Sequence, residues 1–238
     1  MTGCPTVAMV LAAGLGRRML PLTENRPKAL VPVAGRALID HVLDRLVEAG
    51  VENVAVNLHH RAEDLRRHLA GRAGPAIAFS EENGELLDTG GGVANALETL
   101  GDRPFYVANC DVLWGDGLTG TLARLARRWD ARRMDALLLV QPAPAALGYQ
   151  GLGDYFMDPE GALRRRKIGE VAPFVFAGVQ ILHPRLFVDH PSGPFSLNAL
   201  YDLAEWRGRL WGLRHEGMWA HVGRPQDIGA AERELARP

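Results

Sequence analysis

Leu11-Ala-Ala-Gly-Leu-Gly-Arg-Arg-Met19 directly follows the apolar run Val7-Ala-Met-Val-Leu11. A short, uninterrupted apolar run of this kind predicts a buried strand of a parallel sheet. The two glycines let the backbone turn tightly after that strand, so that its N–H groups can approach phosphate oxygens closely. The loop and its continuation also carry three cations, Arg17, Arg18 and Lys28. The sequence therefore predicts a loop that binds a polyphosphate.

Two common phosphate-binding motifs do not account for this loop. The Walker motif, Gly-x-x-x-x-Gly-Lys-Ser/Thr, does not occur in the chain. The dinucleotide fingerprint needs Gly-x-Gly-x-x-Gly at the start of a helix, whereas here Gly14 and Gly16 are followed by Arg17-Arg-Met19 and Pro21 interrupts any helix. An ordinary glycine turn would explain the two glycines alone, but not the whole string through Lys28.

The string resembles the signature of sugar-1-phosphate nucleotidyltransferases, which join a nucleoside triphosphate to a sugar 1-phosphate and release pyrophosphate. Further segments carry the resemblance over nearly the whole chain, namely Pro21–Thr23, Pro27-Lys28, Val33–Gly35, Glu85–Gly92, Asn109–Val112 and Gly178–Pro184. The resemblance implies a three-layer α/β fold with a Rossmann-like, mostly parallel sheet. It also implies one domain over residues 1–238, with a nucleotide-binding half (about 1–140), a sugar-binding half (about 141–238) that includes a small sugar-side lobe, and no C-terminal β-helix domain.

Hydrophobic periodicity supports this α/β organisation. We expect helices over Ala37–Gly50, Ala62–Leu69, Val93–Leu100, Leu118–Trp129, Ser196–Trp206 and Pro225–Leu235. We expect strands over Val54–Leu58, Ala76–Phe79, Arg103–Asn109, Asp135–Val140 and Phe174–Leu182. The triple glycine Gly90–Gly92 is expected to open the helix that follows it and to offer free N–H groups. Trp206, Trp211 and Trp219 are expected in the core, His183 in a structural role, and Arg164-Arg-Arg-Lys167 on a solvated basic face.

Asp111 ends a predicted strand, at the edge where α/β sheets bind ligands, and can coordinate Mg²⁺. Its alternative role is to cap the following turn. The family pattern Trp-x-Asp-Val-Gly-Thr-Pro supplies a second acidic ligand, but this chain has Trp219-Ala-His-Val-Gly-Arg-Pro225. An imidazole binds Mg²⁺ poorly because the ion prefers hard oxygen ligands. His221 is therefore expected to bind pyrophosphate or water, to favour Mn²⁺, or to leave Asp111 as the single protein ligand.

The resemblance implies a role for each remaining candidate residue. Arg18 is expected to stabilise the β,γ-phosphates and the leaving pyrophosphate, and Lys28 the α-phosphate and the incoming sugar phosphate. The nucleotide would also contact Ala12, Ala13, Gly14, Gly16, Arg17, Met19, Gly90, Gly91 and Asn109. The sugar would contact Gly148, Asp154 and Gly178; for Asp154 a surface hairpin with no chemical role is the alternative.

Composition limits the class of partner. The 238 residues carry a net charge of −1, so no global field attracts nucleic acid or an acidic membrane surface. No apolar run approaches the roughly 20 residues that span a bilayer, and no signal peptide is evident. Cys4 and Cys110 are too few for a disulfide framework or a zinc site. We expect a cytoplasmic enzyme, monomeric or weakly dimeric.

Several substrate pairs are compatible with these motifs. UTP with N-acetylmuramate 1-phosphate, in cell-wall sugar recycling, is the favoured pair. GTP with mannose 1-phosphate and dTTP with glucose 1-phosphate are the alternatives, because those enzymes share every strong motif. A non-catalytic nucleotide-sugar sensor also stays open, since His221 replaces an acidic ligand.

Overall fold

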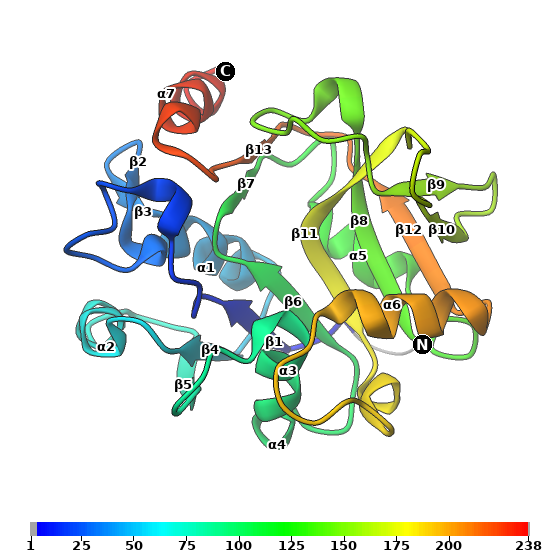
Figure 1. The fold of residues 1–238 in the computed structure, drawn as a ribbon, viewed down its shortest axis with the longest axis horizontal. Helices are drawn as coiled ribbons and strands as arrows, with labels where there is room; N and C mark the ends of the chain where they lie inside the picture. Colours follow the sequence, from blue (N-terminus) through cyan, green and yellow to red (C-terminus); the bar gives the residue numbers. More distant parts are fainter. Residues whose placement is uncertain (1–3, 238) are drawn as a thin grey trace.

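Figure 1 shows a central sheet with helices on both of its faces. The computed structural model describes residues 4–237 of the chain. Within them, nine strands form this sheet. Seven pair in the order β10 (Leu163–Arg165), β9 (Tyr155–Met157), β11 (Phe174–Leu182), β6 (Phe105–Asn109), β1 (Val7–Leu11), β4 (Asn53–Leu58) and β5 (Ala76–Glu81). The other two extend from β11, which pairs with β8 (Ala136–Pro142), and β8 pairs with β12 (Leu210–Arg214).

The N-terminal part of the sheet is parallel, as the sequence predicts. Strand β1 pairs in parallel with β4 and β6, and β4 pairs in parallel with β5. The crossover segments contain α1 (Leu38–Glu48), α2 (Ala62–Leu69), and α3 (Asp88–Asn95) followed by α4 (Leu97–Leu100). The carboxyl ends of these strands therefore share one edge, which is where ligands bind in such sheets.

Strand β11 introduces antiparallel pairing. It pairs antiparallel with β6 and with β8, while β8 and β12 are parallel. The register shifts between Phe176 and Gln180, and Gly178 in this interval has a φ of +75°. Because β11 runs opposite to β6, its beginning near Phe174 lies at the same edge as the carboxyl ends of β1 and β6. The expectation of a mostly parallel α/β fold is confirmed, with this antiparallel strand within it.

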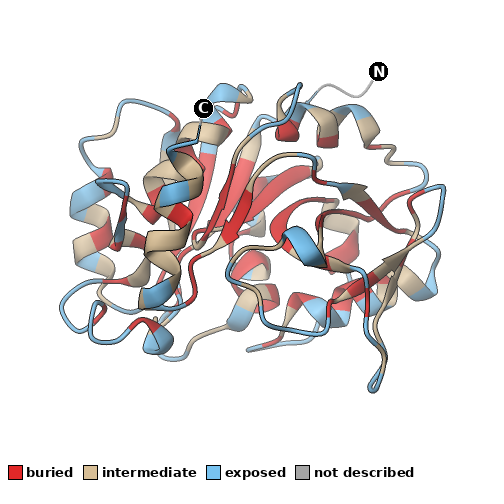
Figure 2. Cartoon of the chain, turned by 90° about the horizontal axis from the view of Figure 1, so that it is seen from above, coloured by how far each residue is buried: buried red, intermediate tan, exposed pale blue. Residues whose placement is uncertain are grey.

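The side chains of the strands point alternately to the two faces of the sheet, so the core consists of two layers. Ala8 and Val10 of β1 belong to the cluster that includes α1, α2 and α5 (Thr121–Arg128). Met9 faces the other side and belongs to the cluster that includes α3, α4 and α6 (Leu197–Trp206). Successive side chains of a strand point to opposite faces, so both faces of a central strand must be apolar. Figure 2 shows the buried residues concentrated in the sheet between the helices.

A third cluster joins the segment after β1 to the C-terminal part of the chain. Strand β7 (Val112–Trp114) pairs antiparallel with β13 (Trp219–His221), and α7 (Pro225–Leu235) follows directly. Buried Met19 packs in the same cluster as Val222 and Ala231. A separate hairpin pairs β2 (Pro32–Val33) with β3 (Arg36–Ala37). The β7–β13 pairing places residue 221 beside residue 112, although the two are far apart in sequence.

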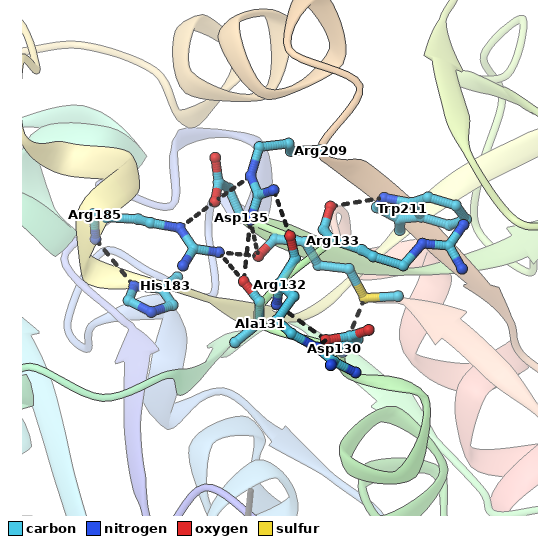
Figure 3. Close-up of polar contacts among 10 residues, drawn as sticks. Asp130, Ala131, Arg132, Arg133, Asp135, His183, Arg185, Arg209 and Trp211 are labelled. Atoms are coloured by element: carbon cyan, nitrogen blue, oxygen red, sulfur yellow. Dashed lines mark hydrogen bonds and ion pairs between the residues drawn. The ribbon is translucent and has the colours of Figure 1, made fainter.

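A polar cluster anchors the start of β8, shown in Figure 3. Asp135 is 3% exposed and accepts hydrogen bonds from Arg185 Nε and, at 2.9 Å, from Arg209 Nε. Both guanidinium groups also donate to the Ala131 carbonyl oxygen. Burial raises the pKa of Asp135, but the two guanidinium groups outweigh it and hold the pKa below its usual value. His183 accepts the Arg185 N–H through Nδ1, which fits the structural role expected for it.

Several local predictions need correction. Trp206 is 83% exposed at the end of α6, so its expected place in the core is wrong, whereas Trp211 and Trp219 are buried. Helix α5 begins at Thr121, after a turn in which the Asp116 carboxylate accepts the Thr121 N–H. The sequence reading also missed the short strands β7, β9, β10, β12 and β13. No helix among residues 4–237 is both long and apolar enough to cross a membrane.

Candidate functional site

A cavity of about 470 Å³ lies at the carboxyl edge of β1 and β6. It collects nearly all of the nucleotide-binding and catalytic residues that the sequence predicts. These are Ala12, Ala13, Gly14, Gly16, Arg17, Arg18, Met19, Lys28, Asn109 and Asp111. The remaining lining residues, which the sequence reading did not select, are Leu11, Leu15, Asn57, Glu82, Leu86, Asp88, Thr89, Cys110 and Gly223.

The glycine loop has the tight geometry expected of it. Gly16 has a φ of +64°, and a Cβ at this position would lie 3.0 Å from Thr23 Cγ2. The Thr23 hydroxyl donates to the Gly16 carbonyl oxygen at 2.9 Å and fixes the turn. Arg17 and Arg18 follow in a short 3₁₀ turn and are exposed on the cavity. A glycine is required here because the positive φ strains other residues and a side chain would crowd Thr23.

Lys28 and Asp111 lie on one wall of the cavity, and His221, which does not line it, contacts Asp111. Lys28 Nζ forms an ion pair with Asp111 Oδ2, and His221 Nε2 lies 3.3 Å from the same oxygen. Burial alone would raise the pKa of Asp111, but the His221 and Lys28 contacts outweigh it and hold the pKa well below its usual value. Asp111 is therefore ionised at neutral pH, and the β7–β13 pairing explains why His221 reaches it.

The position of His221 depends on Gly223. A Cβ at Gly223 would lie 2.7 Å from His221 Cε1, so a larger residue would displace the ring. The ring is also nearly parallel to that of Trp219, with centroids 6.5 Å apart. Its Nε2 is directed at Asp111.

The residues on this wall fit a magnesium ion. Among residues 4–237, no three His, Cys, Asp or Glu side chains form a ready-made cation site. Mg²⁺ does not need one, because it commonly takes one or two carboxylates together with substrate phosphates and water. Both contacts of the Asp111 carboxylate involve Oδ2, and no described residue donates to Oδ1. One carboxylate oxygen therefore remains for a cation.

A buried polar pair behind the loop was missed by the sequence reading. Asn57 Oδ1 accepts the N–H groups of Ala12 at 2.6 Å and of Ala13 at 3.3 Å. Asn57 Nδ2 donates to Glu82 Oε1 at 2.6 Å, and Glu82 Oε2 accepts the Leu87 N–H at 2.8 Å. Asn57 and Glu82 are each 4% exposed. The pair thus ties the glycine loop to the segment 82–87 across the cavity. Asn57 lies near the carboxyl end of β4 and Glu82 directly follows β5, so a polar residue at the carboxyl end of each of two neighbouring strands was the signal available in the sequence.

The structure corrects the reading of Gly90 and Gly91. Both lie inside α3, which begins at Asp88, and both N–H groups donate to the Phe195 carbonyl oxygen, at 2.8 and 3.1 Å. A Cβ at Gly90 would lie 2.3 Å from the Phe195 ring. These glycines therefore permit close packing against the chain before α6, and their N–H groups are not free as expected. Neither glycine lines the cavity.

The three predicted sugar-binding residues lie in different places. Gly178 adjoins the cavity, since a Cβ there would be 3.2 Å from Asn109 Nδ2 and 2.8 Å from Val112 Cγ1. Gly148 lies behind β13, where a Cβ would be 2.3 Å from the His221 carbonyl oxygen. Asp154 lies in a second cavity further along β11.

Comparison with known proteins gives a consistent result for nearly the whole chain. A model of the MobA-like NTP transferase domain matches residues 8–208. The chain is 46% identical to an N-acetylmuramate alpha-1-phosphate uridylyltransferase of Caulobacter vibrioides, over 99% of each chain. It is 36% identical to the enzyme of the same name from Neisseria meningitidis, over 91% of this chain and 92% of that one.

More distant relatives and solved structures match most of this chain. A mannose-1-phosphate guanylyltransferase catalytic subunit beta of Drosophila pseudoobscura is 29% identical over 95% of this chain and 61% of its own length. The inositol-1-phosphate CTP transferase structure from T. maritima has a TM-score of 0.80 at 16% identity, covering 99% of this chain and 96% of that one. HddC from Yersinia pseudotuberculosis, complexed with GMP-PN, has a TM-score of 0.78 at 21% identity, covering 97% and 99%.

Proposed function

Because the chain belongs to the MobA-like NTP transferase family, we propose that it joins UTP to N-acetylmuramate 1-phosphate and releases pyrophosphate. The name and the 46% identity of the Caulobacter relative support this choice of substrates. The observation that supports nucleotidyl transfer most strongly is the single cavity that gathers the glycine loop, three cations and Asp111. The same cavity would suit a family member with another nucleotide, so the substrate pair needs a direct test.

The proposed roles follow from the charges around this cavity. Little covalent chemistry is required of the protein in phosphoryl and nucleotidyl transfer, so catalysis depends on positioning and charge stabilisation. Arg18, exposed on the cavity, would bind the β,γ-phosphates, with Arg17 beside it. Lys28, held in place by Asp111, would bind the α-phosphate and the incoming sugar phosphate. A phosphate monoester is already an anionic nucleophile at neutral pH, so no residue is needed as a general base.

Asp111 is the residue proposed to hold Mg²⁺, with His221 beside it. When bound, the ion would screen the negative charges of the two phosphate groups as they approach. The lowered pKa of Asp111 supports this role, because the carboxylate is ionised over the physiological pH range. His221 is a softer ligand than the acidic residue of the family pattern, so Mn²⁺ is the alternative ion.

Residues 1–140 would bind the nucleotide and residues 141–238 the sugar, with β9, β10 and the loops around them as the sugar-side lobe. We propose a cytoplasmic monomer or weak homodimer, in the compartment that supplies nucleoside triphosphates. Gly178 would border the sugar, because it adjoins Asn109 at the cavity edge.

A substrate panel tests the proposal. Pyrophosphate release is measured with Mg²⁺ for UTP, GTP, dTTP and CTP, each against the 1-phosphates of N-acetylmuramate, mannose and glucose. UTP with N-acetylmuramate 1-phosphate is expected to exceed every other pair. A maximum for GTP with mannose 1-phosphate, or for dTTP with glucose 1-phosphate, would assign a different substrate pair. Nucleotide binding without turnover of any pair would instead indicate a sensor.

A further inference from the structure

The second cavity, of about 230 Å³, lies on the sugar side of the molecule and contains an arginine without an acidic partner. Its lining residues are Asp154, Tyr155, Arg165, Arg166, Phe176 and Asn198. They come from β9, β10, β11 and the beginning of α6, together with Asp154 directly before β9 and Arg166 directly after β10. The run 164–167 was expected to form a solvated basic face; its side chains are partly or fully exposed, and Arg165 and Arg166 also line this cavity.

The arginines of the run differ in how their charge is balanced. Arg164 pairs with Glu170 at 2.7 Å, and Arg165 pairs with Asp202. Arg166 has no carboxylate within ion-pair distance among the described residues. Its Nε donates to the Gly153 carbonyl oxygen at 2.9 Å, and its Nη1 donates to backbone carbonyl oxygens. These neutral contacts orient the guanidinium group without neutralising it, and no described residue accepts from Nη2.

Asp154, the acidic residue of this cavity, accepts hydrogen bonds from groups other than Arg166. Asp154 Oδ2 accepts the Phe176 N–H at 2.9 Å, and Oδ1 accepts the Tyr149 hydroxyl at 3.3 Å. Burial raises the pKa of Asp154 above its usual value. Asp154 thus fixes the start of β11. The charge of Arg166 acts on Asp154 without forming an ion pair, so the guanidinium group stays available for an anion from outside the protein.

The two cavities border the same strand. Phe176 lines the second cavity, and Gly178, two residues along β11, adjoins Asn109 of the first cavity. Two residues of a regular strand span about 7 Å, which is an upper limit here because the register of β11 shifts in this interval. A pyranose ring has a comparable width, so a sugar whose phosphate lies at Lys28 would direct its far side along β11 toward Arg166.

We propose that Arg166 binds a carboxylate on that far side of the sugar. This inference rests on the proposed function, because N-acetylmuramate is N-acetylglucosamine with a lactic acid attached by an ether bond at O3. The lactyl group supplies one carboxylate, which is ionised at neutral pH and matches the planar fork of a guanidinium group. Arg166 would then be the residue that selects muramate over glucosamine, while Lys28 and Asp111 serve any sugar phosphate.

The test compares Arg166→Gln with the wild type on two sugar phosphates that differ only in the lactyl group. With UTP and Mg²⁺, kcat/KM for N-acetylmuramate 1-phosphate is expected to fall about 10- to 100-fold, the loss typical of one charge-assisted contact. Turnover of N-acetylglucosamine 1-phosphate and the KM for UTP should stay unchanged. Arg166→Lys keeps the charge and should retain part of the preference. Arg164→Gln is the matched control, since Arg164 does not line the cavity, and should leave the preference intact.

The outcomes separate this inference from the proposed function. Equal losses for both sugars would mean that Arg166 only supports the local structure, and an unchanged preference would mean that it does not contact the carboxylate; either result overturns the inference alone. Failure of the wild type to use N-acetylmuramate 1-phosphate, with turnover of another sugar phosphate, would overturn the proposed substrate and this inference together. The activities of the wild type on the two sugar phosphates are enough to recognise this last outcome.

Discussion

Replacing Asn57 by alanine should damage both stability and nucleotide binding, although Asn57 is buried behind the glycine loop. The change removes the acceptor of the Ala12 and Ala13 N–H groups and the donor to Glu82 Oε1. Two neutral hydrogen bonds contribute about 1 kcal/mol each, and the bond to the carboxylate about 1.5 to 3 kcal/mol, which gives a loss of about 3.5 to 5 kcal/mol. The Glu82 oxygen is left without this partner in a buried site, which places the loss toward the upper value.

Urea unfolding measures the loss of stability, and steady-state kinetics measure the effect on the site. The KM for UTP should rise because the loop loses its anchor, while the KM for the sugar phosphate changes less. Asn53→Ala is the matched control, because Asn53 begins the same strand but is exposed. It should change stability by no more than about 0.5 kcal/mol.

A double-mutant cycle with Glu82→Gln isolates the contact between the two side chains. The double variant should be more stable than the sum of the single changes predicts by about 1 to 2 kcal/mol, since it no longer buries an unpaired charge. The account of this pair would be refuted if Asn57→Ala behaved like Asn53→Ala, or if the two changes were strictly additive.

Three further predictions concern other parts of the fold. Gly92→Ala should lower the free energy of unfolding in urea by about 1 to 3 kcal/mol, because the new Cβ would lie 2.8 Å from Glu82 Oε1. An unchanged free energy of unfolding would show that the backbone moves to accommodate the Cβ at no cost. The lowered pKa of Asp135 contributes stability that is present above the unfolded value of about 4 and is lost as pH falls through the folded pKa. Asp135→Asn should therefore lower stability at pH 7 by about 3 kcal/mol and flatten its acid dependence, so an unchanged pH profile would count against this cluster. His221→Asp adds a hard oxygen ligand beside Asp111, so this variant should bind Mg²⁺ more tightly than the wild type in calorimetry. Weaker binding would contradict the proposal that Asp111 holds the ion.

The loop from residue 11 to Lys28 could be predicted from the sequence because its chemistry is local. A strand, two glycines and nearby cations lie within one short segment, and their spacing restricts what they can bind. The bounds of amphipathic helices such as α1 and α2 were predicted within one or two residues for the same reason, because the spacing of apolar residues within each segment defines its buried face.

Features that depend on contacts distant in sequence were not predictable in this way. Asn57 and Glu82 lie 25 residues apart and meet only because β4 and β5 pair. Gly90 reads as a helix opener from propensity alone, but packing against Phe195 places it inside the helix. Trp206 fits the apolar pattern of its helix, yet the helix ends before any element covers it.

The most direct test of nucleotidyl transfer measures both products in one reaction of UTP with N-acetylmuramate 1-phosphate. Wild-type protein should form pyrophosphate and the uridine diphosphate sugar in equal amounts, and Lys28→Met should lower kcat/KM by about 100-fold or more, as expected for the loss of one charge-stabilising donor. Arg26→Met, which removes an exposed cation nearby that does not line the cavity, should have little effect. Release of inorganic phosphate without the nucleotide sugar, or full activity of Lys28→Met, would contradict the assignment of this cavity as the transfer site.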